Sequence, residues 1–198
     1  MSMSRCGWQG IVFIAFIAVA SGSVHAATLQ IDLKGTAGDG LRAGNQNPAV
    51  SGGSGGETGA GISYDDVSNL LTIHVGWGTG KGFTNLTGNA NAGHLHGPTL
   101  DSPPLAYTEN AGVDVPLDGL AGWNPSATNG GLDDSVTLTA GQENTLLAGK
   151  YYMNVHTVAN GNGEIRGQLV VVPEPATATL LLCGSALALA RRRRRVTK

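Results

Sequence analysis

Three histidines in the second half of the chain have the spacing of metal ligands. His94 and His96 flank one leucine in the run AGHLHG (92–97). On a β-strand, residues i and i+2 project from the same face, about 7 Å apart along the chain. Their imidazoles can converge on one ion, and His156 supplies a third nitrogen, a set suited to Zn²⁺ or Cu²⁺. Glu164 completes this predicted set, as a fourth ligand or as a partner that orients His156.

The same residues also have a structural interpretation, because they lie in a predicted β-hairpin. The stretch YYMNVHTVANGNGEIRGQL (151–169) contains two alternating runs joined by an Asn/Gly turn. Only one pairing keeps apolar residues opposite apolar ones, so the register should be well specified. The polar face then forms a ladder of three pairs, which are Tyr152 with Gln168, Asn154 with Arg166, and His156 with Glu164. In this interpretation the ladder holds the strands together, and Arg166 is an ion-pair partner.

An enzyme is the third possibility, and the sequence argues against it. A histidine pair on a β-sandwich strand resembles part of Cu/Zn superoxide dismutase. The segment 27–172 has four histidines, His74, His94, His96 and His156, and lacks the further ligands of a bridged two-metal centre. It contains no HExxH motif, no cysteine and no recognisable pair of nucleophile and base. We therefore expect no catalytic residues and no enzymatic activity.

Short alternating runs, separated by Gly, Asn, Asp and Pro, indicate the elements that would position these residues. No apolar period of 3.6 residues is found between 27 and 172. The predicted strands are 28–35, 59–65, 70–77, 92–97, 114–117, 135–139, 150–157 and 164–172. The glycine-rich segment 51–59 and much of 98–131 are predicted loops. Many short strands with turn signals between them predict an all-β fold, an antiparallel β-sandwich or barrel.

The N-terminal segment 1–26 has the order of a secretory signal peptide. A basic residue, Arg5, precedes an apolar run (11–20), and small residues precede a predicted cleavage site between Ala26 and Ala27. The run is too short for a spanning helix, which needs roughly 20 apolar residues. We expect this segment to be removed on export.

The C-terminal segment 173–198 resembles the PEP-CTERM sorting tail of exporting Gram-negative bacteria. A Pro-Glu-Pro tripeptide precedes an apolar stretch (176–190), and five arginines follow. The residues that carry the sorting motif are Pro173, Glu174, Pro175, Arg191 and Arg192. The resemblance implies that an exosortase in the inner membrane recognises and removes the tail. An apolar helix of fifteen residues is a marginal span, so we expect a transient inner-membrane anchor with the arginines on the cytoplasmic side.

Charge and cysteine content narrow the function of the central segment, 27–172. It holds five Lys and Arg against thirteen Asp and Glu, a net charge of −8. This charge argues against nucleic acid and anionic lipid as partners. The two cysteines of the chain, Cys6 and Cys183, lie in the two end segments. The exported domain would therefore depend on packing, and on a bound metal if there is one, rather than on a disulfide.

The order of the motifs in the central segment resembles the chordin-type domain, CHRD. An opening LKGTAGDGLRAGNQNPAV (33–50) is followed by GAGISYD, LLTIHVGWG and GHLHGP, and the chain closes with LLAGKYYMNVHTVANGNGEIRGQL. The insertion between Pro98 and Ser135, which carries Trp123, and the glycine-rich loop depart from the family's pattern. The resemblance implies an immunoglobulin-like antiparallel β-sandwich or barrel in an extracellular protein, without catalytic activity.

These observations predict three segments, a signal peptide (1–26), a CHRD domain (27–172) and a sorting tail (173–198). The expected protein is exported, sorted by exosortase, and located at the cell surface or in the extracellular matrix with a structural or binding role. Its expected partners are the export machinery, exosortase, and exopolysaccharide or other matrix components. The alternative function is a histidine-based Zn²⁺- or Cu²⁺-binding module, and a superoxide-dismutase-like enzyme ranks below it.

Overall fold

The computed structural model describes residues 28–173, which form one antiparallel sheet folded over on itself. The strands are β1 (Thr28–Lys34), β2 (Leu41–Arg42), β3 (Ser54–Asp65), β4 (Leu70–Trp77), β5 (Ala90–His96), β6 (Val113–Pro116), β7 (Trp123–Ser126), β8 (Asn129–Thr137), β9 (Tyr152–Thr157) and β10 (Ile165–Val171). One α-helix, α1 (Ala140–Leu147), and three 3-10 turns, η1 (Ala43–Asn45), η2 (Thr79–Lys81) and η3 (Leu105–Thr108), accompany them. The all-β sandwich fold predicted from the sequence is therefore confirmed. The helices on either side of the domain, one in the signal peptide (1–26) and one in the apolar stretch 176–190, were also predicted and lie outside the described residues.

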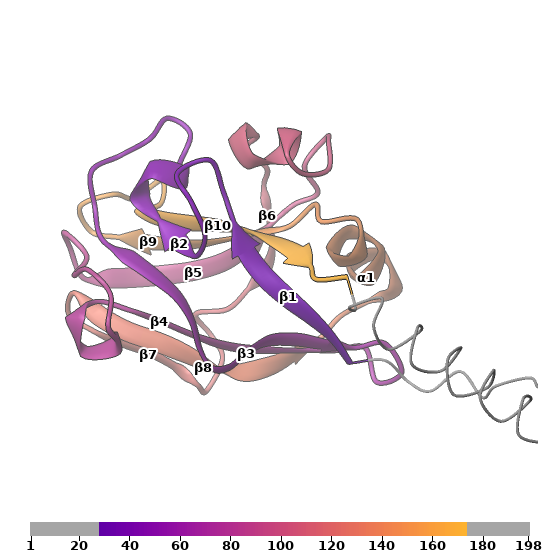
Figure 1. Cartoon of the computed structure of the whole chain (residues 1–198). Coiled ribbons are helices and arrows are strands. Elements are labelled where there is room, and N and C mark those ends of the chain that lie inside the picture. Colours follow the sequence, from indigo (N-terminus) through magenta and orange to yellow (C-terminus); the bar gives the residue numbers. More distant parts are fainter. Residues whose placement is uncertain (1–27, 174–198) are drawn as a thin grey trace, which may run out of the picture.

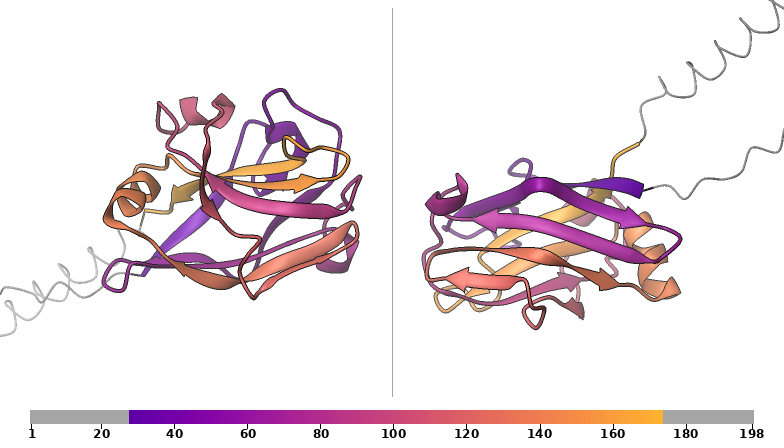
Figure 2. Two further views of the ribbon diagram at one scale, coloured as in Figure 1. Left: turned by 180° about the vertical axis from the view of Figure 1, so that it is seen from behind. Right: turned by 90° about the horizontal axis from the view of Figure 1, so that it is seen from below.

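Two layers of strands enclose the core (Figures 1 and 2). The strand order is β6-β5-β9-β10-β1-β3-β4-β8-β7, and β2 pairs with β10 and β3. One layer contains β5, β9 and β10, the other contains β3, β4, β7 and β8, and β1 crosses from one to the other (Figure 1). Apolar side chains at alternate positions fill the space between the layers. Among them are Met153 and Val155 of β9, both fully buried.

Trp123 of β7 packs on the core from the predicted insertion. Its ring lies 5.1 Å from that of Trp77. It also lies against the backbone of Gly93 in the opposite layer, where any Cβ would overlap the indole. Besides β6, which overlaps the strand predicted at 114–117, the segment 98–131 supplies the unpredicted β7 and the first residues of β8. Trp123 of β7 also makes a contact between the layers.

The glycine-rich segment 51–59 is also more regular than predicted, because Ser54 begins β3. A Cβ on Gly55 would run into the carbonyl oxygen of Gly76 on the neighbouring strand. Glycine here reflects a close approach of two backbones rather than the flexibility that its composition indicates.

Helix α1 was not expected from the apolar period. It has eight residues and buries only Leu146, so it leaves no pattern of spacing. Its start is nevertheless encoded, because Thr139 and Gln142 form a capping box.

The hairpin of β9 and β10 has the register that alternation predicts. Asn154 lies opposite Arg166, and Tyr152 lies opposite Gln168. Strand β10 also pairs with β1, and the backbone N–H of Val172 donates to the carbonyl of Gln30. The two ends of the described domain therefore lie side by side (Figure 1).

Candidate metal centre

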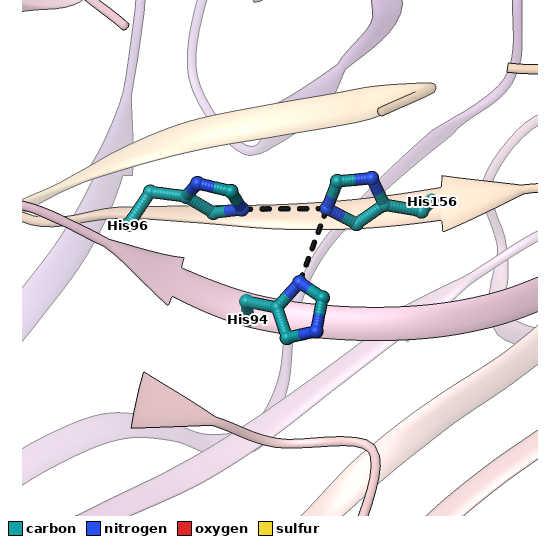
Figure 3. A group of neighbouring side chains, drawn as sticks. All are labelled: His94, His96 and His156. Carbon is teal, nitrogen blue, oxygen red and sulfur yellow. Dashed lines mark hydrogen bonds between the residues drawn. The ribbon is translucent and has the colours of Figure 1, made fainter. Parts of the chain in front are cut away.

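The pairing of β5 with β9 brings the three predicted histidines onto one face of the sheet (Figure 3). His94 and His96 are two residues apart on β5 and therefore share a face. In the register of this pair, Ala92 lies opposite His156 and His94 lies opposite Asn154. His156 is thus the diagonal neighbour of His94, close enough for the side chains to meet.

The ring nitrogens of the three histidines converge (Figure 3). His94 Nδ1 lies 3.2 Å from His156 Nε2, and His96 Nε2 lies 3.3 Å from the same atom. One nitrogen from each residue can be chosen so that all three lie within 4.8 Å of one another. Two imidazole nitrogens bound to one tetrahedral Zn²⁺ would be about 3.3 Å apart, given the usual bond lengths. The spacing is therefore that of ligands around a shared ion. We call these three residues the histidine cluster.

Backbone carbonyls fix which nitrogen of two histidines carries the proton. His96 Nδ1 lies 3.0 Å from the carbonyl oxygen of Ala111, and His156 Nδ1 lies 3.0 Å from that of Gly161. A carbonyl only accepts, so both Nδ1 atoms must donate and both neutral Nε2 atoms carry lone pairs. These two lone pairs face each other at 3.3 Å and cannot form a hydrogen bond. A cation between them would convert this repulsion into attraction.

The surroundings favour the neutral imidazoles that metal binding requires. Burial is the main cause that lowers the pKa of His96 to about 4; the Ala111 hydrogen bond opposes this shift, and the neighbouring His156 and His94 add to it. Burial also lowers the pKa of His156. At neutral pH these two ligands therefore hold no second proton that a metal would have to displace.

The carboxylate of Asp118, which sequence reasoning missed, lies behind the cluster. Asp118 Oδ2 lies 3.9 Å from His94 Nε2, the ring nitrogen that is not the one near His156. Each histidine of the cluster thus has an oxygen near the ring nitrogen that points away from the other two. The oxygen belongs to Asp118 for His94, to the carbonyl of Ala111 for His96 and to the carbonyl of Gly161 for His156. Such partners orient metal-bound histidines. Sequence patterns could not reveal them, because two are backbone atoms and Asp118 lies in a loop far along the chain.

Glu164 is the member of the predicted ligand set that the structure places elsewhere. Its carboxylate accepts hydrogen bonds from the backbone N–H groups of Gly53 and Thr87 and from the side chains of Thr87, Thr157 and Asn160. Burial raises its pKa, but these hydrogen bonds outweigh burial and hold the pKa below its usual value. Glu164 precedes the first residue of β10, so strand alternation does not direct its side chain toward His156. We call this group the Glu164 hub.

Arg166 lies in the polar ladder but is not the ion-pair partner predicted. In the described part of the chain no carboxylate forms a salt bridge with it. Its guanidinium donates to the carbonyl oxygens of Ala106 and Glu109 and to the side chain of Asn110. It also lies 3.5 Å from the centre of the Tyr152 ring. Carbonyls of an ordered loop thus take the place of the expected carboxylate.

The ladder links the histidine cluster to two loops. The Tyr152 ring stacks on His96, with centroids 5.0 Å apart and planes inclined by 9°. The Tyr152 hydroxyl is hydrogen-bonded to the backbone of Ala111, the residue whose carbonyl holds His96. Asn154 accepts from Gln46, which lies after η1. These contacts hold both loops over the face that carries the cluster.

The remaining predicted site residues are Gln168 of the ladder and the residues of the sorting motif and cleavage site; His74 is the one histidine of the domain outside the cluster. Gln168 belongs to the ladder and donates to the carbonyl of Gly149. His74 lies apart from the cluster on β4, where its Nδ1 is 2.7 Å from Asp133. Pro173 is the last described residue. The other predicted sorting residues and the predicted cleavage site at Ala26 and Ala27 lie outside the described residues.

Fold and site together define the class of protein, an antiparallel β-sandwich with a buried polar hairpin and a histidine cluster. The chain belongs to the CHRD domain family, whose model matches residues 40–169. The PEP-CTERM protein-sorting motif matches residues 171–195, directly after the domain. No curated protein and no solved structure matches the chain significantly. Both matches agree with the resemblances seen in the sequence, and neither family is known as an enzyme family.

The sorting motif carries an implication for location. A PEP-CTERM tail implies recognition by the exosortase machinery, and hence export and sorting to the surface of a Gram-negative bacterium. Within residues 28–173, no helix has the length and apolar character to cross a membrane. The predicted apolar stretch at 176–190 is outside that range.

Proposed function

We propose that the protein is a non-enzymatic binding module of the cell surface or extracellular matrix. In this proposal residues 1–26 direct export, residues 27–172 form the working domain, and residues 173–198 anchor the chain transiently in the inner membrane until exosortase acts. The observation that supports it best is the PEP-CTERM match, which begins where the CHRD match ends. Exopolysaccharide or another matrix component would be the partner.

Replacing Pro173, Glu174 and Pro175 together by alanine tests the sorting step. The variant should remain in the membrane fraction at its unprocessed mass, as should the native chain in cells without exosortase. His74→Gln, far from the motif, should be processed and released normally. Normal processing of the triple variant would contradict the proposal.

A second function, binding of Zn²⁺ or Cu²⁺, is favoured by the histidine cluster. Its support is the pair of facing lone pairs on His96 Nε2 and His156 Nε2. His94 Nδ1 can donate to His156 Nε2, and His96 Nε2 is then left facing an acceptor without a proton of its own. His96 is buried and the other two histidines are half-buried, and a shared cation would satisfy all three nitrogens. A bridged two-metal centre has less support, because residues 28–173 contain no second group of this kind.

Calorimetric titration of the purified full chain with Zn²⁺ and with Cu²⁺ tests this function. One ion should bind per chain. His156→Gln should abolish the heat of binding, because it removes the nitrogen that both other histidines face. His74→Gln is the matched control and should bind as the native chain does. Equal binding by both variants, or none by the native chain, would remove the metal-binding function.

A further inference from the structure

We infer that a metal ion in the histidine cluster keeps one coordination position open for an external carboxylate, such as that of a sugar acid. The inference rests on the proposed metal-binding function and adds a ligand class to it. Three features of the site carry it: the number of protein ligands, the charge around them, and the cavity beside them.

The first feature is the number of protein ligands. Zn²⁺ takes four ligands in proteins, and sites with three histidines leave the fourth position to water or substrate. In the described residues, the group that can hold an ion contains the three histidines and no carboxylate or thiol. Asp118 approaches the other nitrogen of His94, and Glu164 is occupied by its own donors. Neither carboxylate is placed to fill the fourth position.

The second feature is charge. Three neutral imidazoles leave both positive charges of the ion uncompensated, and Asp118 offsets only part of them. Arg166 is buried on the same face and is hydrogen-bonded to uncharged oxygens only. Its guanidinium lies behind Tyr152, which stacks on His96. An anion at the open position would therefore be attracted to a locally positive site, although the domain as a whole is acidic.

The third feature is a cavity of about 350 Å³ that is lined by His96 but not by His94 or His156, so it adjoins the cluster on the side of His96. Besides His96 and Tyr152, its walls include the carboxamides of Gln46, Asn110, Asn154 and Asn162. Carboxamides both donate and accept hydrogen bonds, as hydroxyl groups do. A ligand that joins a carboxylate to several hydroxyls, as a sugar acid does, would match the metal with one end and these walls with the other.

Cobalt substitution provides the test. Co²⁺ replaces Zn²⁺ in such sites, and its visible absorption reports the ligands around it. The purified full chain would be loaded with Co²⁺ and titrated with acetate, glucuronate and, as the uncharged control, glucose. Acetate and glucuronate should shift the bands saturably, with glucuronate binding at least about tenfold more tightly, since it also contacts the cavity. Glucose should leave the bands unchanged.

Asn162→Ala separates the sugar contacts from the metal contacts. Asn162 is exposed in the turn between β9 and β10, so the change should leave the fold intact. It should weaken glucuronate and leave acetate unaffected. Bands that form but ignore both anions would overturn this inference alone. Equal affinity for acetate and glucuronate would overturn the assignment to a sugar acid. A chain that takes up no Co²⁺ would overturn the metal-binding function and this inference with it.

Discussion

The Glu164 hub and the histidine cluster lie at one end of the same hairpin, yet their hydrogen bonding differs. Glu164 is an acceptor surrounded by donors, and all its neighbours are satisfied by it. In the histidine cluster, two acceptor nitrogens, His96 Nε2 and His156 Nε2, face each other. A buried polar group whose hydrogen bonds are all satisfied within the protein stabilises the fold. A group of acceptor atoms that lack donors can instead be satisfied by a bound ligand, such as a metal ion. This difference is the reason we propose a structural role for Glu164 and a binding role for the histidines, although their sequence signals are alike.

Removing the hub should give the largest effect. Glu164→Ala leaves several buried donors without an acceptor, so the free energy of unfolding should fall by about 3 to 5 kcal/mol. Denaturant unfolding measures this. Asp66→Ala, in the exposed turn between β3 and β4, is the control and should change stability by less than about 0.5 kcal/mol. If Glu164→Ala lowers the free energy of unfolding by less than about 1 kcal/mol, the Glu164 hub contributes no more to stability than an ordinary surface residue.

Adding a metal should stabilise the cluster and thereby the fold. With free Zn²⁺ at about 100 times its Kd, the stabilisation is about 2.7 kcal/mol, which corresponds to a rise in Tm of roughly 5–10 °C. A thermal melt with and without Zn²⁺ measures it. His94→Gln should lose the rise and His74→Gln should keep it. An unchanged Tm in the native chain at saturating Zn²⁺ would mean that the facing nitrogens have no ligand role.

Acid should weaken the hub by a smaller amount than Glu164→Ala, because protonation removes the charge but keeps the side chain. The folded-state pKa of Glu164 is depressed, so its contribution to stability is present above the unfolded value of 4.5 and is lost as pH falls through the folded pKa. Unfolding free energies at about pH 6 and pH 3 should therefore fall more in the native chain than in Glu164→Gln. The difference isolates Glu164, since every other titratable group is the same in both proteins. Parallel losses would show that its hydrogen bonds are not charge-dependent.

The smallest effect should come from the carboxylate behind His94. Asp118→Asn keeps the size of the side chain but removes its charge, so Zn²⁺ affinity should drop about tenfold. Asp133→Asn changes the partner of His74 in the same way and should leave Zn²⁺ affinity unaltered. Competitive titration with a chelating dye measures both. An equal loss in the two variants would indicate a general charge effect rather than positioning.

The parts of the molecule that follow strand alternation were predictable from the sequence. The register of β9 and β10 and the convergence of His94, His96 and His156 both follow from side chains that alternate between two faces. Glu164 was assigned to the cluster because the same rule was extended by one residue beyond the strand, where the backbone turns away. The predicted partner of Arg166 failed for another reason, since backbone carbonyls leave no trace in a sequence.

The errors about loops came from composition. Glycines at 52–56 read as flexible, but Gly55 is small because another strand passes close by. The segment 98–131 contains Pro, Asn and Gly in the proportions of a loop, yet Trp123 lies between the layers. In both cases the deciding contact joins residues far apart in the chain, which local patterns cannot express.

The pairing of β1 with β10 has a consequence for how the protein would stand on a cell. Both ends of the domain emerge at one pole, and β10 runs about 20 Å from the neighbourhood of His156 toward that pole. Whichever end holds the chain to the envelope, the turn at Gly161 would point outward. The pairing of β1 with β10 therefore determines both where the chain would be attached and that the histidine cluster lies at a distance from that attachment point.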